Sequence, residues 1–305
     1  MSALEALIAE EATAPLAPPI AAVAGAARAR FADSAMAVLF YGSCLRKADD
    51  SGGIADLYVL VDDYRNAWSA WLAVANRLLP PNVLYLEAPF AGRTVRAKVA
   101  VISLDDFEAG VRRWFHSYIW ARFAQPCRLG YARDEVARAR VLAALAGAVR
   151  RMAAEAAPLL EPPFDARRLW AGSLGATYRA ELRAERLERA NELVAAYAER
   201  YDRVTASLVE EGLLAVAADG YRLADAGRRR GVGFRWAQRC WLGKLLSVLR
   251  LAKAAFTFED GAGYLAWKIE RHSGVEVQLT PWQRRHPILA SPALFWRLYR
   301  RGAVQ

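Results

Sequence analysis

The segment from residue 36 to residue 61 constrains the fold of this chain more than any other. "MAVLF" (36–40) and "IADLYVLV" (54–61) are rich in β-branched and aromatic residues, and the pair Gly42-Ser43 follows the first run. Runs of this kind are typical of buried strands, and a Gly-Ser pair permits a tight turn. One carboxylate, Asp56, lies near the start of the second apolar run. A charge is costly to bury there, so we expect it to have a specific role.

Alternating apolar residues predict two more strands in the first half of the chain. "NVLYLEAPF" (82–90) indicates a short strand, and "RTVRAKVAVISL" (93–104) indicates a further one. Helical patterns flank these strands and cover residues 1–13, 20–33, 64–79 and 104–126. On the 64–79 helix, one face is expected to carry Trp68, Trp71, Leu72 and Ala75.

The second half of the chain is predicted to be mainly helical. A helical period covers 134–157, "PLLEPPF" (158–164) is a predicted linker, and 166–212 predict two long helices. A hairpin-like piece is expected at 212–225, and basic or aromatic helices are expected at 228–258, 264–274 and 280–301. We therefore expect an α+β fold, in which a mixed sheet flanked by helices precedes a mainly helical region.

The charge balance restricts the partners of the chain. Lysine and arginine number 42 against 32 aspartate and glutamate residues, which gives a formal net charge of +10, and 55% hydrophobic residues exclude a disordered chain. Such a charge favours anionic partners, although an arginine-rich proteome would explain it as well. The arginines are spread over several predicted helices without a nucleic-acid reader motif. We therefore expect no nucleic-acid partner and look to nucleotides and an anionic membrane surface.

The cysteines and the hydropathy pattern indicate the compartment. Cys44, Cys127 and Cys240 form no CxxC pattern, so neither a disulfide framework nor a zinc site is indicated. The first residues lack the basic region of a signal peptide, and no apolar run approaches the ~20 residues that span a bilayer. We expect a cytoplasmic protein that is soluble or peripheral on the inner face of the membrane.

The Gly-Ser turn and the following aspartate resemble the DNA-polymerase-β-like nucleotidyltransferases. In that layout, backbone N–H groups at Gly42 and Ser43 approach a triphosphate, and Asp56 holds a Mg²⁺ ion that bridges phosphate oxygens. The chain departs from the pattern because Tyr58 occupies the usual position of a second acid. Asp62 lies on the same strand face, but six residues at ~3.3 Å each put it ~20 Å from Asp56. A protein that binds nucleotide without catalysis remains an alternative.

A longer set of motifs resembles one branch, the mitochondrial translocator-assembly-and-maintenance family of peripheral phosphatidate cytidylyltransferases. The segments that carry the resemblance are "YGSCLR", "IADLYVLVDDYRNAW", "LYLEAPF", "VRAKVAVISL", "WFHSYIWARFAQPCRL", "SLGATYRAELRAE" and "RLAKAAFTF". The family also lacks the second acid, so Tyr58 does not count against catalysis. The chain departs from it at Ser69, where the family has histidine, and at "YLE", where it has Tyr-Phe-Asn.

The resemblance implies a division of the chain into four regions. Residues 1–33 form an N-terminal helical segment, and 34–133 form the nucleotidyltransferase domain. Residues 134–227 form a helical, winged-helix-like domain. The basic helical region 228–305 packs back on the nucleotidyltransferase domain.

The resemblance and the residue chemistry together name the candidate site residues. Asp56 and Lys98 are expected to be catalytic, and Tyr41, Gly42, Ser43 and Arg122 are expected to bind the nucleotide. Arg183 and Lys253 are candidates for the acceptor phosphate. Glu87 ends a neighbouring strand and is a candidate second metal ligand, or else a surface residue. Lys98 on an apolar strand face contacts phosphate or, alternatively, extends to solvent at the strand edge.

The implied reaction joins CTP and phosphatidic acid to give CDP-diacylglycerol and pyrophosphate, with Mg²⁺ as cofactor. Two alternatives stay open. One is a nucleotidyltransferase that acts on a small phosphorylated acceptor, and the other is a non-catalytic nucleotide-binding protein of the same fold.

Overall fold

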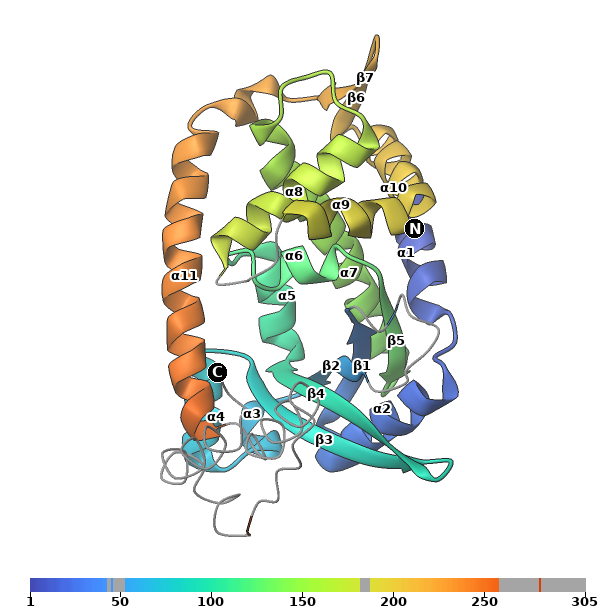
Figure 1. Cartoon of the computed structure of the whole chain (residues 1–305), viewed down its shortest axis with the longest axis vertical. Helices are drawn as coiled ribbons and strands as arrows, with labels where there is room; N and C mark the ends of the chain where they lie inside the picture. The colour runs from blue at the N-terminus through green and yellow to red at the C-terminus, as the bar shows by residue number, and fades with distance from the viewer. Residues whose placement is uncertain (43–44, 46–52, 182–186, 258–279, 281–305) are drawn as a thin grey trace, which may run out of the picture.

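A five-stranded mixed sheet lies at one end of the molecule (Figure 1), in a computed structural model that describes residues 1–42, 45, 53–181, 187–257 and 280. The strands are β1 (Ala35–Tyr41), β2 (Ile54–Val61), β3 (Asn82–Phe90), β4 (Arg93–Ser103) and β5 (Cys127–Ala132). Their order is β3-β4-β2-β1-β5, with β2 and β4 parallel and the other neighbours antiparallel. The prediction of an α+β fold with a mixed sheet flanked by helices is confirmed.

Helices cover both faces of this sheet. Helix α2 (Pro18–Phe31) contacts strands β1 to β5 along one face. On the other face, α6 (Trp120–Phe123) places Phe123 against Tyr58, with ring centroids 5.0 Å apart. Helices α5 (Leu104–Arg112) and α7 (Glu135–Ala156) complete this second layer, and α1 (Ala3–Thr13) packs on α7 and β5. Side chains alternate along a strand, so Asp56 shares the α6 face with Tyr58.

The predicted helix over 64–79 is wrong in one respect. The chain forms α3 (Tyr64–Ala67) and α4 (Ala70–Leu78), with extended backbone at Trp68 between them. This break turns Trp68 inward, where it is 8% exposed and packs on Phe31 at a centroid distance of 5.5 Å. Trp71 is 59% exposed. The expected common face for the two tryptophans is therefore not formed.

The structure departs from the predicted elements at other places as well. The 104–126 helix is interrupted after α5, and β5 follows it without having been predicted. The 166–212 region forms three helices, which are α8 (Ala166–Ala180), α9 (Leu187–Ala196) and α10 (Ala198–Glu210). The expected hairpin is present as β6 (Leu214–Ala217) and β7 (Gly220–Leu223). The expected helices at 264–274 and 280–301 fall almost entirely outside the described residues.

One hydrophobic core joins the two halves of the chain. It includes Leu4 of α1, Leu39 of β1, Leu145 of α7 and, in the second half of the chain, Trp236. In the second half, the buried indole of Trp170 donates a hydrogen bond of 2.9 Å to Thr205, which ties α8 to α10. Within the described ranges, no helix combines the length and apolar content that a bilayer crossing requires.

The long helix α11 (Val232–Thr257) runs from the helical half back to the sheet (Figure 1). It crosses the end of α8 at Gly243, where a Cβ would overlap the carbonyl oxygen of Ala180. At its far end, the Arg250 Nε donates to the carbonyl oxygen of Pro80 at 2.9 Å. The contacts of α11 with α8 and β3 therefore fix its position on the molecule.

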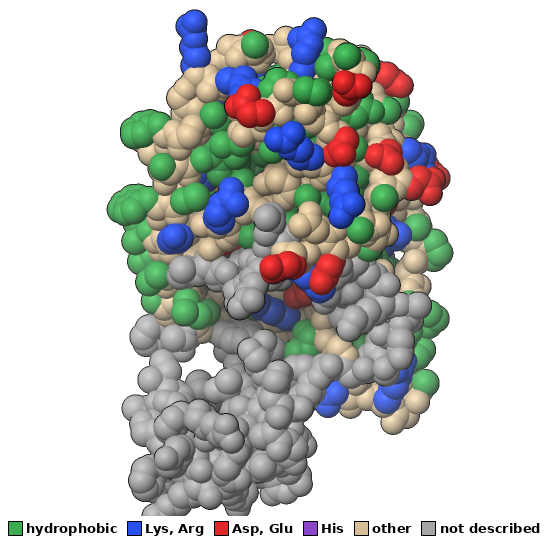
Figure 2. Space-filling model, turned by 45° about the horizontal axis from the view of Figure 1, so that its top comes forward, with side chains coloured by type: hydrophobic (Ala, Val, Ile, Leu, Met, Phe, Trp, Pro, Cys, Tyr) green, Lys and Arg blue, Asp and Glu red, His purple; other side chains and the backbone are tan. Residues whose placement is uncertain are grey.

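The outward face of α11 is mainly apolar, with Lys244 among its exposed residues. Its exposed apolar residues are Phe234, Trp241, Leu245, Val248, Leu249 and Leu251. Most of them recur at helical spacing and form one stripe, and Figure 2 shows hydrophobic side chains along the edge of the molecule where α11 lies. Helix α4 exposes a second apolar set, Trp71, Val74 and Leu78. The two helices are neighbours, because Lys253 of α11 bonds to Asn76 of α4.

Lys253 anchors the end of α11, so its loss is expected to destabilise the fold. Its ammonium donates to Asn76 Oδ1 at 3.0 Å and to the carbonyl oxygens of Leu79 and Pro81 at 2.7 and 2.8 Å. Lys253→Met leaves these acceptors without a donor, and we expect it to lower the free energy of unfolding by about 2–4 kcal/mol in urea denaturation. The control is Lys244→Met on the exposed side of α11. If Lys253→Met lowered the free energy of unfolding no more than Lys244→Met does, Lys253 would not anchor the end of α11.

Candidate functional site

Four side chains form a row across the sheet at the end of β1. Tyr41 is in register with Asp56, Asp56 with Lys98, and Lys98 with Tyr85. Residues in register on neighbouring strands share a face, so all four project toward the side on which α6 lies. The mixed topology produces this row, because the parallel pairing of β2 with β4 brings the aspartate beside the lysine.

The row lies where the helical cover of this face ends. Tyr58, two residues further along β2, is fully buried under α6. Asp56 is half-buried and Lys98 is exposed. The expectation that Lys98 is hard to bury therefore does not apply, because its ammonium stays in contact with solvent. Lys98 is thus the exposed member of the row, whereas Tyr85 is 6% exposed.

The Gly42 backbone lies directly against the Asp56 carboxylate. Gly42 has a φ of +89°, and a Cβ on it would lie 2.7 Å from Asp56 Oδ2. A residue with a side chain is therefore excluded from this turn by both the backbone conformation and the carboxylate. The structure thus brings Gly42 and Asp56 together at the end of β1. Ser43, the other half of the predicted turn, lies outside the described residues.

Arg122 of α6 extends the site behind Tyr41. Its Nη1 donates to the carbonyl oxygen of Tyr118 at 2.7 Å, and its Nη2 lies 3.6 Å from Glu181 Oε2. The guanidinium carbon lies 4.2 Å from the Tyr118 ring centre and 5.9 Å from that of Tyr41. Only 11% of the side chain is exposed. A buried cation thus stands next to the row.

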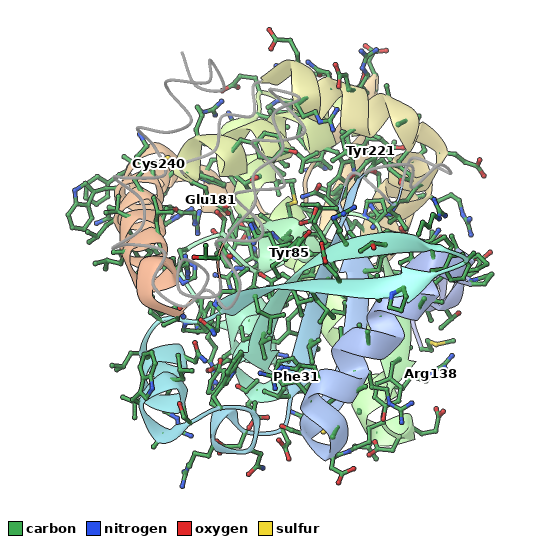
Figure 3. The ribbon with its side chains drawn as sticks, turned by 60° about the horizontal axis from the view of Figure 1, so that its bottom comes forward. Phe31, Tyr85, Arg138, Glu181, Tyr221 and Cys240 are labelled. Atoms are coloured by element: carbon green, nitrogen blue, oxygen red, sulfur yellow. The ribbon has the colours of Figure 1, made fainter. Side chains whose placement is uncertain are left out.

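Arg122, Tyr118, Glu181 and Arg250 form a cluster beside the row. Two of its members, Tyr118 and Arg250, were not predicted from the sequence. The Arg250 guanidinium carbon lies 4.0 Å from the Tyr118 ring centre, so α11 brings a second arginine to the ring that Arg122 contacts. The spacing of Arg239, Gly243 and Arg250 along α11 places them on one inward face, and this period is a signal that the sequence does contain. Glu181 is the carboxylate of the cluster. Figure 3 shows Glu181 and Tyr85 on one side of the sheet and Phe31 on the opposite side.

Glu87 does not join Asp56. It accepts hydrogen bonds from Tyr85 Oη at 2.8 Å and from Arg96 Nε at 3.1 Å. It lies in register with Arg96, two strands and two residues away from Asp56, which corresponds to about 12 Å between Cα atoms. The structure therefore gives no support to a metal shared by these two carboxylates. Among the described residues, no group of three or more His, Cys, Asp or Glu side chains is arranged to hold a metal ion.

The two candidates for the acceptor phosphate are not brought to the row. All three N–H groups of Lys253 donate to acceptors in the α4–β3 connection, so the ammonium is committed to the fold. Burial, and secondarily the Arg250 guanidinium, lowers the pKa of Lys253 to about 8. Arg183 lies outside the described residues.

Neither a protein-family model nor a curated protein sequence matches this chain. The functional interpretation therefore depends on the sequence motifs and on the geometry around Gly42 and Asp56.

The contact between Gly42 and Asp56 can be measured with two alanine substitutions. Gly92 in the β3–β4 turn also has a positive φ, +76°, but no atom lies within 4 Å of its Cβ position. Gly92→Ala therefore introduces only backbone strain, about 1 kcal/mol. Gly42→Ala adds the overlap with Asp56 Oδ2, and we expect it to lower the free energy of unfolding by about 1–2 kcal/mol more. Equal losses in urea denaturation would show that the carboxylate does not occupy this position.

Proposed function

We propose that the chain is a Mg²⁺-dependent nucleotidyltransferase whose site is the row of Tyr41, Asp56 and Lys98. The observation that carries the proposal is the packing of the Gly42 backbone against the Asp56 carboxylate at a strand end. A small-residue turn lets a triphosphate approach the backbone, and the aspartate is in position to bind the metal of that triphosphate. Asp56 is half-buried and lies in register with Lys98, which is exposed.

The residues at the row fit a nucleotide-bound Mg²⁺ ion. In sites of this kind the protein supplies one or two carboxylates, and substrate phosphates and water complete the octahedron. Asp56 would be the protein ligand, which is consistent with the separation of Glu87 from it. When bound, the ion neutralises charge on the phosphates as pyrophosphate leaves.

The protein groups around Asp56 have distinct roles in this proposal. Lys98 and Arg122 supply positive charge to the triphosphate, and the Tyr41 ring orients Arg122 beside it. An oxygen of the acceptor phosphate bonds to the α-phosphorus of the nucleotide. The bond from that phosphorus to the bridging oxygen breaks, and pyrophosphate leaves with the electron pair. A phosphate oxygen is already ionised at neutral pH, so the site needs no general base.

We infer the nucleotide and the acceptor, CTP and phosphatidic acid, from the motif resemblance together with the surface of α11. The outward stripe of α11 presents Trp241 at 69% exposure and Leu245 at 41%. The chain carries a formal net charge of +10, which favours an anionic bilayer. Aromatic and aliphatic side chains on a surface helix, combined with positive charge, are typical of peripheral membrane binding. The proposed location is therefore the inner face of the cytoplasmic membrane.

Activity can be tested with labelled nucleotides. We expect the protein, Mg²⁺ and phosphatidic acid to convert one nucleoside triphosphate, CTP, into a lipid-soluble nucleotide product. Asp56→Asn removes the charge that holds the metal, and we expect it to lower kcat at least about a hundredfold with little effect on thermal stability. The control is Asp202→Asn on the exposed side of α10.

The results separate the proposed function from its alternatives. Turnover with a soluble phosphorylated metabolite, but not with phosphatidic acid, would favour a small acceptor. Nucleotide binding without any turnover in wild type would favour a non-catalytic protein.

Membrane binding has its own test. We expect the wild-type protein to sediment with vesicles that contain phosphatidic acid, and less so at high salt. Replacing Trp241 and Leu245 together by glutamate removes apolar contact and adds repulsion, so the vesicle-bound fraction should fall severalfold. The control is Val216→Glu on the β6–β7 hairpin, an exposed apolar residue outside α11. If both variants bind vesicles equally, α11 is not the membrane surface.

A further inference from the structure

Two arginines from distant parts of the chain contact one aromatic ring. The guanidinium carbons of Arg122 and Arg250 lie 4.2 and 4.0 Å from the ring centre of Tyr118. Arg122 comes from α6 beside the sheet, and Arg250 comes from the inward face of α11. Like charges repel, and in a partly buried site the repulsion is larger than in water. An arrangement of this kind is stabilised when an anion binds close to the two cations.

The described residues supply less negative charge than this cluster requires. Glu181 forms an ion pair with Arg122 at 3.6 Å, and its charge also acts on Arg250, for which the described residues contain no carboxylate within ion-pair distance. On the other side of Arg250, burial first, and then Arg250 and Arg239, lower the pKa of His116 to about 3, so this ring is neutral at pH 7. The cluster therefore carries excess positive charge within the described part of the chain.

Arg250 also has hydrogen-bonding capacity to offer. Within the described residues, its one hydrogen bond runs from Nε to the carbonyl oxygen of Pro80 at 2.9 Å. The two terminal nitrogens of the guanidinium remain for another acceptor. Burial lowers the pKa of Arg250, a sign that the charged form pays for desolvation at this position. A guanidinium so placed is suited to the two-pronged binding of a phosphate.

The cluster adjoins the proposed catalytic row. Tyr41, a member of the row, lies beside the cluster. Its strand position is in register with Asp56, and its ring centre is 5.4 Å from that of Tyr58. Arg122 contacts the same Tyr41 ring. An anion bound by Arg250 would therefore lie near Arg122 and the nucleotide rather than at a remote surface.

We infer that Arg250, which contacts the same Tyr118 ring as Arg122, forms the seat for the phosphate of the acceptor, a phosphomonoester. This inference rests on the proposed function for the reaction that follows, but not for the binding itself. It assigns to Arg250 the role that the sequence gave to Lys253, whose N–H groups are committed to Asn76, Leu79 and Pro81. Helix α11 thus reaches the site with its inward face while its outward face is mainly apolar.

Binding is measured by titration calorimetry with two probes, inorganic phosphate and short-chain phosphatidic acid below its micelle concentration. We expect Arg250→Gln to weaken binding of both probes at least about tenfold. The matched control, Lys244→Gln, removes the same charge from the exposed side of α11 and should leave affinity unchanged. Tighter binding of the lipid identifies a lipid headgroup as the source of the phosphate, and equal binding identifies a small phosphorylated acceptor. Unchanged phosphate affinity in Arg250→Gln would show that Arg250 does not bind the phosphate.

A second variant keeps the inference testable if Arg250→Gln does not fold. Arg250→Lys retains the charge but loses the planar fork, and we expect severalfold weaker phosphate binding than in wild type. Affinity equal to wild type would overturn a two-pronged contact by Arg250.

Kinetics then distinguish this seat from a nucleotide site. We expect Arg250→Gln to raise the KM for the acceptor about tenfold and to leave the KM for CTP within about twofold. A rise in the KM for CTP alone would overturn the assignment to the acceptor. If no variant, wild type included, turns over any nucleotide while Arg250→Gln still loses phosphate affinity, the proposed function fails and the phosphate seat stands.

Discussion

The candidate site depends on the parallel pairing of β2 with β4. This pairing places Asp56 in register with Lys98, while the antiparallel pairing of β1 with β2 brings the chain back so that Gly42 follows the strand beside Asp56. If β1, β2 and β4 were not neighbours, the three residues would be separated by at least one further strand spacing of ~4.8 Å. The topology of the sheet therefore creates the contact on which the proposed chemistry relies.

Helix α11 completes the surroundings of this row from the far end of the sequence. Its inward face carries three cations with different partners: Arg239 binds the Phe115 carbonyl oxygen and Glu155, Lys253 binds the α4–β3 connection, and Arg250 contacts Tyr118. The first two are held by protein acceptors and stabilise the helix on the molecule, although Nη1 of Arg239 is buried without a hydrogen-bond partner in the described part of the chain. Among the described residues, Arg250 has one hydrogen bond and no carboxylate within ion-pair distance. This difference, rather than the overall basic charge, singles out one arginine as a ligand-binding residue.

The two faces of α11 suit a protein that takes a substrate from a membrane. The outward stripe around Trp241 and Leu245 is apolar, and the inward face at Arg250 is cationic. A phosphomonoester lipid has the same division between an apolar body and an anionic head. In the proposed function, the helix contacts the bilayer with one face and the headgroup with the other.

The sequence by itself determined the four strands with β-branched alternation, the small-residue turn at Gly42 and the aspartate that faces it, because these signals depend only on near neighbours in the chain. It did not determine β5, whose six residues have little alternation, or the break that turns Trp68 into the core. It also misplaced Lys253 and overlooked Arg250. A cation on a helix acquires its role from the side chains that pack against it, and those lie more than a hundred residues away in the sequence. Only the tertiary structure decides which buried charges are paired within the fold and which are left to bind a ligand.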